Sequence, residues 1–136
     1  MGQQRKKRWG YFLYDFANSG YVVVFGTLLL PIAFKDRLLA EDPRADFYWG
    51  ACISAAVIAA AVLAPLVGYA ADRLRRRSVL ALCVGPAGVG MASLAMIAGR
   101  ESAAPLLVAL LFVGTHSLYV LSVAVCDSYL SHLGED

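Results

Sequence analysis

Long apolar runs alternate with short charged blocks along this chain. Each run exceeds the about 20 residues that an α-helix needs to cross a hydrocarbon core of about 30 Å. The pattern therefore predicts an all-α membrane protein with four transmembrane helices, at residues 10–34, 47–71, 78–99 and 104–129.

The positively charged residues are divided unevenly between the two sides that these spans define. Eight lysines and arginines fall in residues 1–9 and 72–77, whereas four fall in residues 35–46 and 100–103. Because lysine and arginine are enriched on the cytoplasmic side, both termini are predicted to be cytoplasmic. The connecting segments are then a cytoplasmic basic N-terminus (1–9), two external loops (35–46 and 100–103), a cytoplasmic basic loop (72–77) and a cytoplasmic tail (130–136).

Composition indicates the same class. Hydrophobic residues make up 60% of the 136 residues, and the mean hydropathy is +0.63. A soluble domain of this size could not cover so much apolar surface. We therefore expect an integral membrane protein of the bacterial inner (plasma) membrane, with the lipid bilayer as a partner. No nucleic acid partner is expected, because a stop-transfer role explains the basic loop.

Small residues recur at every fourth position of the second predicted span. Positions four apart stack on one helix face, so a neighbouring helix can approach closely there. The stripe predicts a helix-packing face and consists of Cys52, Ala56, Ala60, Ala64 and Gly68, with Asp72 continuing it at the cytosolic end.

The cysteines indicate neither a disulfide framework nor a metal site. Cys52, Cys83 and Cys126 are odd in number and far apart in the sequence. We interpret them as small packing residues, and we expect no metal and no cofactor.

Apart from cysteine, ionisable side chains between the ends of the spans are confined to the first and fourth spans. Each costs on the order of 3 kcal/mol at the bilayer centre, so such residues mark functional sites or specific contacts between helices. Helical spacing places them on one face of each span, which predicts that these two helices line a wet cavity while the second and third face protein and lipid. The candidate substrate or ion pathway comprises Asp15, Asn18, His116, Tyr119 and Asp127.

Three of these residues each have two roles that stay open. Asp15 is either a proton or cation site or a hydrogen-bonding partner within the bundle. His116 is either a proton relay or substrate contact, or it makes an interhelical hydrogen bond. Asp127 is either part of the pathway or the polar end of its span.

Two separated motifs carry a resemblance to a known family. The first is Gly68-x3-Asp72-Arg73-x2-Arg76-Arg77, which resembles the loop between helices two and three of major facilitator superfamily transporters. The second is Tyr14-Asp15-Phe16-Ala17-Asn18-Ser19-Gly20-Tyr21, which is similar to the first helix of the vacuole-effluxer-like, or unidentified-major-facilitator, branch. A weaker likeness covers residues 126–133, where Ser131 stands in place of the branch's usual proline.

The resemblance implies a twelve-helix secondary transporter that moves small, amino-acid-like solutes by alternating access, and the branch it resembles is associated with their export. This chain would supply its first four helices, as an N-terminal fragment or truncated product. The remaining helices of the transporter or a partner chain would complete it. The implied cytoplasmic gate consists of Gly68, Asp72, Arg73, Arg76 and Arg77, and the coupling ion is expected to be a proton or another cation.

Two other functions are compatible with parts of the sequence. A self-sufficient four-helix exporter that dimerises would also carry an acid in its first helix, but the strong positive-inside bias disfavours it. A non-transporting membrane protein could bind a partner through the small residues of positions 56–68. No catalytic residues are expected, because the sequence has no metalloprotease, phosphate-loop or nucleophile-elbow motif.

Overall fold

The computed structural model describes residues 9, 12–14, 16–40, 42–98, 100 and 104–131. Nearly all of these residues are helical, and none of them belongs to a β-strand, which confirms the all-α class. The elements are η1 (Tyr21–Leu29), α2 (Leu30–Ile32), η2 (Ala33–Leu38), α3 (Ala45–Arg73), α4 (Arg76–Ala98) and α5 (Pro105–Ser131).

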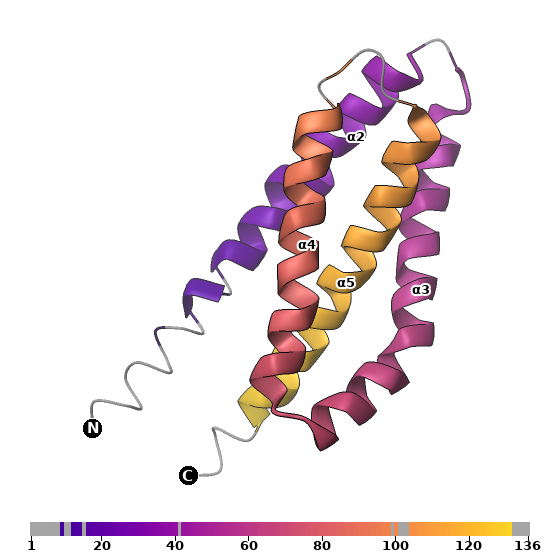
Figure 1. The fold of residues 1–136 in the computed structure, drawn as a ribbon. Coiled ribbons are helices and arrows are strands. Elements are labelled where there is room, and N and C mark those ends of the chain that lie inside the picture. Colours follow the sequence, from indigo (N-terminus) through magenta and orange to yellow (C-terminus); the bar gives the residue numbers. More distant parts are fainter. Residues whose placement is uncertain are drawn as a thin grey trace.

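Three helices, α3, α4 and α5, are long and apolar enough to cross a membrane. The first predicted span, 10–34, is helical at residues 12–14 and 16–34, and the helix continues to residue 38; these helical residues are here called the first helix. The span also includes residues outside the described ones. Four spans therefore remain a prediction. Figure 1 shows the start of the first helix, the α3–α4 turn and the end of α5 at one end of the bundle.

The first helix is wound more widely than an α-helix along much of its length. The π-helical segments η1 and η2 flank α2, which holds Pro31 at its first turn. Proline lacks the N–H of a normal i→i−4 bond and crowds the preceding turn. A shift to i→i+5 pairing is one way in which a helix accommodates such a disturbance.

Helix α5 is the centre of the bundle. In the apolar stretch of each long helix, 33% of the α5 residues are buried, against 11% of the residues in α3 and 11% in α4. Helix α5 packs along both α3 and α4, which touch each other little, and Figure 1 shows it lying between them.

The core forms three layers along α5. The largest contains Leu30, Phe34, Trp49, Leu94, Val108 and Phe112. The other two contain Ala60, Cys83 and Leu121, and Ala71, Val79 and Val125. At the end of the largest layer, Lys35 of η2 forms an ion pair with Asp46 in the first turn of α3, which ties the first helix to α3.

The small-residue stripe of α3 packs against α5 over only part of its length. Ala56 and Ala60 are buried, and the Ser117 hydroxyl of α5 shares its hydrogen between the Ala56 carbonyl at 2.9 Å and the Val113 carbonyl of its own helix at 2.6 Å. Ala64 and Gly68 are exposed, whereas Ala71 is buried. A four-residue spacing drifts around a helix of 3.6 residues per turn, so the contact face moves from the stripe to Ala71.

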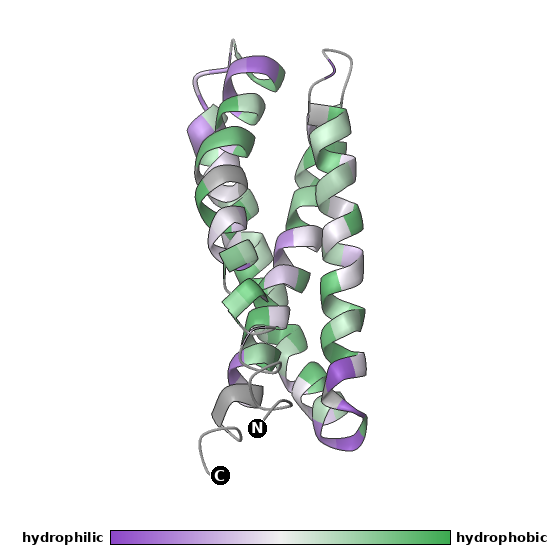
Figure 2. Cartoon of the chain, turned by 90° about the vertical axis from the view of Figure 1, so that its left-hand side faces the viewer, coloured by the Kyte–Doolittle hydropathy of each residue, from purple (hydrophilic) through white to green (hydrophobic). Residues whose placement is uncertain are grey.

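The outside of the bundle is apolar. Figure 2 shows hydrophilic residues gathered mainly at the two ends, with hydrophobic residues between them. In the view from above, Trp9, Phe12 and Met96 lie at the periphery, and each is more than 60% exposed. A continuous apolar exterior between polar ends suits a lipid environment.

Replacing Gly90 with alanine should destabilise the contact between α4 and α5. A Cβ at Gly90 would overlap the Thr115 hydroxyl and lie 3.2 Å from Thr115 Cβ. The overpacking, about 1–3 kcal/mol, exceeds the gain in helix propensity of at most about 1 kcal/mol. Thermal unfolding in detergent should therefore show a lower midpoint. Gly85→Ala is the matched control, because no atom lies within 4 Å of its added Cβ, and it should leave the midpoint equal or higher.

Candidate functional site

A cavity of about 260 Å³ lies between the first helix, α4 and α5, near the middle of both long helices. Its α4 side is apolar, whereas the first helix and α5 contribute amide and hydroxyl groups. The lining residues are Tyr14, Ala17, Asn18 and Tyr21 of the first helix, Val84, Ala87, Gly88 and Met91 of α4, and Thr115, Tyr119 and Ser122 of α5.

Two side-chain hydrogen bonds cross from the first helix to α5. The Tyr14 hydroxyl lies 3.0 Å from Ser122 Oγ, which itself donates to the Tyr119 carbonyl at 2.7 Å. Tyr14 therefore donates to Ser122. The Tyr21 hydroxyl lies 3.1 Å from His116 Nδ1. At membrane depth such pairs satisfy groups that would otherwise be left in hydrocarbon.

A continuous row of rings connects the loop end of the bundle to this cavity. Trp49 contacts Phe112 at a centroid distance of 4.6 Å, and Phe112 stacks on His116 at 5.2 Å. Next to them, Tyr21 packs on Tyr119 at 4.1 Å. These contacts fix the position of the His116 ring, because Phe112 stacks on it and the Tyr21 hydroxyl is hydrogen-bonded to Nδ1.

Two polar groups of the cavity make no hydrogen bond with any other described side chain. These are the Asn18 amide, which is half-buried, and the Thr115 hydroxyl, which belongs to a buried residue. Polar groups inside a membrane protein are normally satisfied. The Asn18 amide is therefore available to a molecule in the cavity, whereas the Thr115 hydroxyl lies against Gly90 of α4.

Three of the five predicted pathway residues come together. Asn18 and Tyr119 line the cavity, and His116 lies behind Tyr21 and Tyr119, in contact with both rings. Asp127 is exposed further along α5 and does not line the cavity. Asp15 lies outside the described residues.

The residues of the predicted gate motif lie at the α3–α4 turn. Gly68 and Asp72 line a smaller cavity of about 170 Å³ between α3 and α5. The Arg73 guanidinium lies 4.7 Å from the centre of the Tyr69 ring, a cation–π contact. Arg77 is exposed, and Arg76 begins α4 with a side chain outside the described ones.

Several parts of the cavity were not predicted from the sequence. The third span was expected to face protein and lipid, but α4 forms one side of the cavity, because Gly88 and Ala87 leave space there. Tyr14, Tyr21 and Thr115 were not predicted as site residues either. The spacing of Tyr14, Asn18 and Tyr21 at i, i+4 and i+7 was a usable signal, because it places all three on one helix face.

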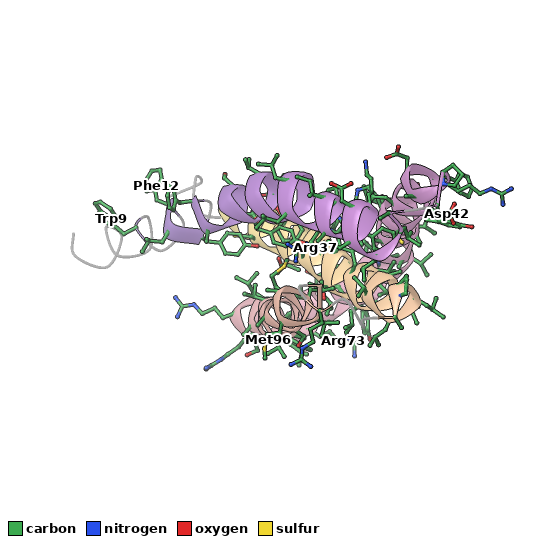
Figure 3. The ribbon with its side chains drawn as sticks, turned by 90° about the horizontal axis from the view of Figure 1, so that it is seen from above. Trp9, Phe12, Arg37, Asp42, Arg73 and Met96 are labelled. Carbon is green, nitrogen blue, oxygen red and sulfur yellow. The ribbon has the colours of Figure 1, made fainter. Side chains whose placement is uncertain are left out.

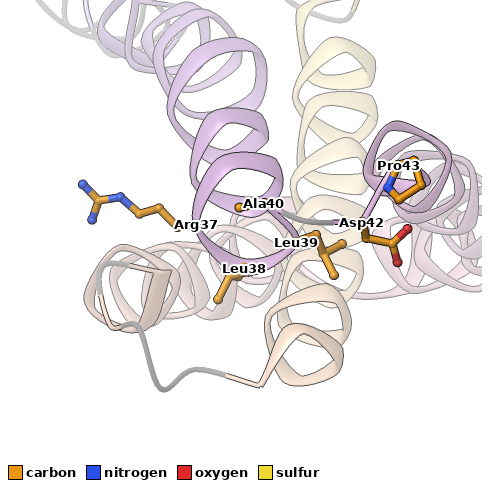
Figure 4. Close-up of a pocket in the computed structure, with 6 residues that line it drawn as sticks. All are labelled: Arg37, Leu38, Leu39, Ala40, Asp42 and Pro43. Carbon is orange, nitrogen blue, oxygen red and sulfur yellow. The ribbon is translucent and has the colours of Figure 1, made fainter.

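The loop between the first helix and α3 also encloses a hollow, shown in Figure 4. Arg37 and Asp42 line it, but Figure 4 shows their side chains pointing in opposite directions. Asp42 Oδ1 accepts a 2.8 Å hydrogen bond from the Arg44 backbone N–H. The two charges therefore do not converge on one ligand. Among the described residues, no group of three His, Cys, Asp or Glu side chains is placed to hold a metal ion.

Comparison with protein-family models, with curated proteins and with solved structures found no match to this chain.

Proposed function

We propose that this chain is the N-terminal part of a secondary transporter that moves small, amino-acid-like solutes by alternating access, in the efflux direction. In this proposal the first helix is a fourth membrane span, and both termini and the basic 72–77 loop face the cytoplasm. The membrane is the bacterial inner membrane. Further helices, from the rest of the transporter or from a partner chain, form the opposite side of the pathway and meet the Asp72 gate.

The cavity between the first helix, α4 and α5 is the observation that carries the proposal. It lies at mid-depth, where each polar group is costly, and its Asn18 side chain has no partner among the described side chains. A volume of about 260 Å³ is just below the about 300–1,000 Å³ of pockets for drug-sized ligands, so it suits a small solute.

The charge distribution supports the orientation. The four arginines of the 72–77 loop lie at the end of the bundle where the described part of the first helix starts and α5 ends, and the other four basic residues precede that helix in the sequence. Reporter domains attached after residue 136 should read cytoplasmic. A reporter that reads both sides would instead favour the dual-topology, four-helix exporter.

A deletion strain complemented with variants tests the transport function. Restoring the wild-type chain together with the helices that complete the transporter should restore efflux of labelled neutral amino acids, whereas Asn18→Ala should lower it about two- to tenfold, the equivalent of one lost hydrogen bond. Leu110→Ala is the matched control, since its side chain is 62% exposed on the outer surface of α5. Efflux that is the same in the deletion strain, or in Asn18→Ala, would contradict the proposal.

A further inference from the structure

The Tyr21–His116 contact joins a titratable ring to the cavity. Tyr21 lines the cavity and His116 does not, so Tyr21 lies between a bound solute and the imidazole. A tyrosine hydroxyl is both a donor and an acceptor, and its hydrogen can take either of two positions in the plane of the ring. The state of His116 Nδ1 therefore decides which way the Tyr21 hydrogen points.

The two protonation states of His116 give Tyr21 opposite roles. When His116 is neutral with its hydrogen on Nε2, Nδ1 accepts the Tyr21 hydrogen, and Tyr21 offers the cavity only lone pairs. When His116 is protonated, Nδ1–H donates to Tyr21 Oη, and the Tyr21 hydrogen turns towards the cavity. The 3.1 Å separation fits a hydrogen bond in either direction.

Tyr21 is the hydrogen-bonding partner of His116 among the groups that surround the ring. The titratable groups that face it are the hydroxyls of Tyr21 and Tyr119, while Phe112 stacks on its ring. Between their charged ends, α3 and α4 carry titratable side chains only at Cys52 and Cys83 over residues 49–67 and 78–98. The pair formed by Lys35 and Asp46 lies at the loop end of the bundle.

We propose that His116 and Tyr21 form a proton-controlled donor switch, through which one proton on His116 enables the cavity to bind a solute by a hydrogen-bond acceptor such as a carbonyl or carboxylate oxygen. The inference rests on the proposed function and deepens it, because it identifies a proton as the coupling ion. Reciprocity follows: a solute that accepts the Tyr21 hydrogen promotes protonation of His116 by the same factor as the proton promotes solute binding.

Binding of an acceptor-only probe tests the switch without transport. N,N-dimethylacetamide carries a carbonyl acceptor, has no donor and does not titrate, and its binding to the whole chain in nanodiscs can be followed by ligand-observed NMR. The expected affinity is about two- to tenfold higher at about pH 5 than at about pH 8. Equal affinity at both pH values would overturn the switch.

Matched variants locate the effect. His116→Asn places a non-titrating acceptor near the position of Nδ1, and Tyr21→Phe keeps the ring but removes the hydroxyl; each should bind weakly and independently of pH. Tyr14→Phe removes the other cross-helix hydrogen bond and should keep the pH dependence. If His116→Asn does not fold, Tyr21→Phe still decides. If the probe affinity of Tyr21→Phe still depends on pH, the controlling proton lies elsewhere.

The imidazole itself gives a second readout. In a His132→Gln background, His116 is the remaining histidine of the chain, so its nitrogen NMR signals report its protonation directly. At about pH 6.5 the probe should increase the protonated fraction, and neutral His116 should carry its hydrogen on Nε2. A neutral ring with the hydrogen on Nδ1 would overturn the inference. If the chain shows this pH-dependent binding but efflux is not restored, the switch is supported and the proposed function fails.

Discussion

Replacing Ala56 with leucine should separate α3 from α5 and lower the free energy of unfolding by about 1–4 kcal/mol. Ala56 has no exposed surface, and its carbonyl accepts the Ser117 hydroxyl at 2.9 Å. A larger side chain adds about 1–3 kcal/mol of overpacking, and losing the Ala56 share of the Ser117 hydrogen bond adds up to about 1 kcal/mol, because Ser117 keeps the Val113 carbonyl of its own helix. Unfolding by SDS in mixed micelles measures the difference.

The neighbouring residue supplies the control for that experiment. Ala55 is exposed, so Ala55→Leu adds the same atoms on the outer surface of α3, where lipid accommodates them. Its free energy of unfolding should stay within about 0.5 kcal/mol of wild type. Equal losses in the two variants would mean that α3 does not approach α5 through Ala56.

The apolar runs were sufficient to predict the three long helices, because length and hydropathy are local properties of a sequence. The central place of α5 was not predictable in this way. Its mean hydropathy resembles that of α3, and its burial depends on which helices surround it. The small-residue stripe showed that α3 packs closely, but not that the contact shifts away from Ala64.

The candidate site was predictable to the extent that polarity alone marks a membrane residue. Asn18, His116 and Tyr119 stand out because polar groups are costly inside a span, and the structure places them around one cavity or next to it. Thr115 did not stand out, since threonine can satisfy its hydroxyl within its own helix. The apolar α4 side carried no chemical signal, because a cavity arises from small side chains meeting across helices.

The hydrogen-bond partners of the polar residues show which of them hold the helices together and which face the cavity. Tyr14 and Ser122 satisfy each other, so they hold the first helix against α5. Asn18 faces the cavity without such a partner among the described side chains, and the Thr115 hydroxyl lies against Gly90 of α4. Tyr21 belongs to both groups, because it lines the cavity while it is bonded to His116. Solute binding and helix contact therefore meet at one hydroxyl.

Replacing Phe112 with alanine should cost about 2–3 kcal/mol of unfolding free energy and loosen His116. Phe112 is 2% exposed and lies between Trp49, at 4.6 Å, and His116, at 5.2 Å. Phe→Ala in soluble cores costs about 3–5 kcal/mol, part of which is transfer to water. In a bilayer that part shrinks, because lipid is as apolar as the core, and the cost of the cavity remains.

Trp49 provides the readout for this variant. The chain has two tryptophans, of which Trp9 is 61% exposed and Trp49 is 8% exposed, so a Trp9→Phe background isolates the buried ring. Phe112→Ala should change its emission and lower the unfolding midpoint, whereas Leu110→Ala, at a side chain 62% exposed, should do neither. Efflux should fall with Phe112→Ala as well, because a ring that has lost its stacking partner no longer holds Nδ1 at the Tyr21 hydroxyl. Equal results for the two variants would show that the row of rings does not position His116.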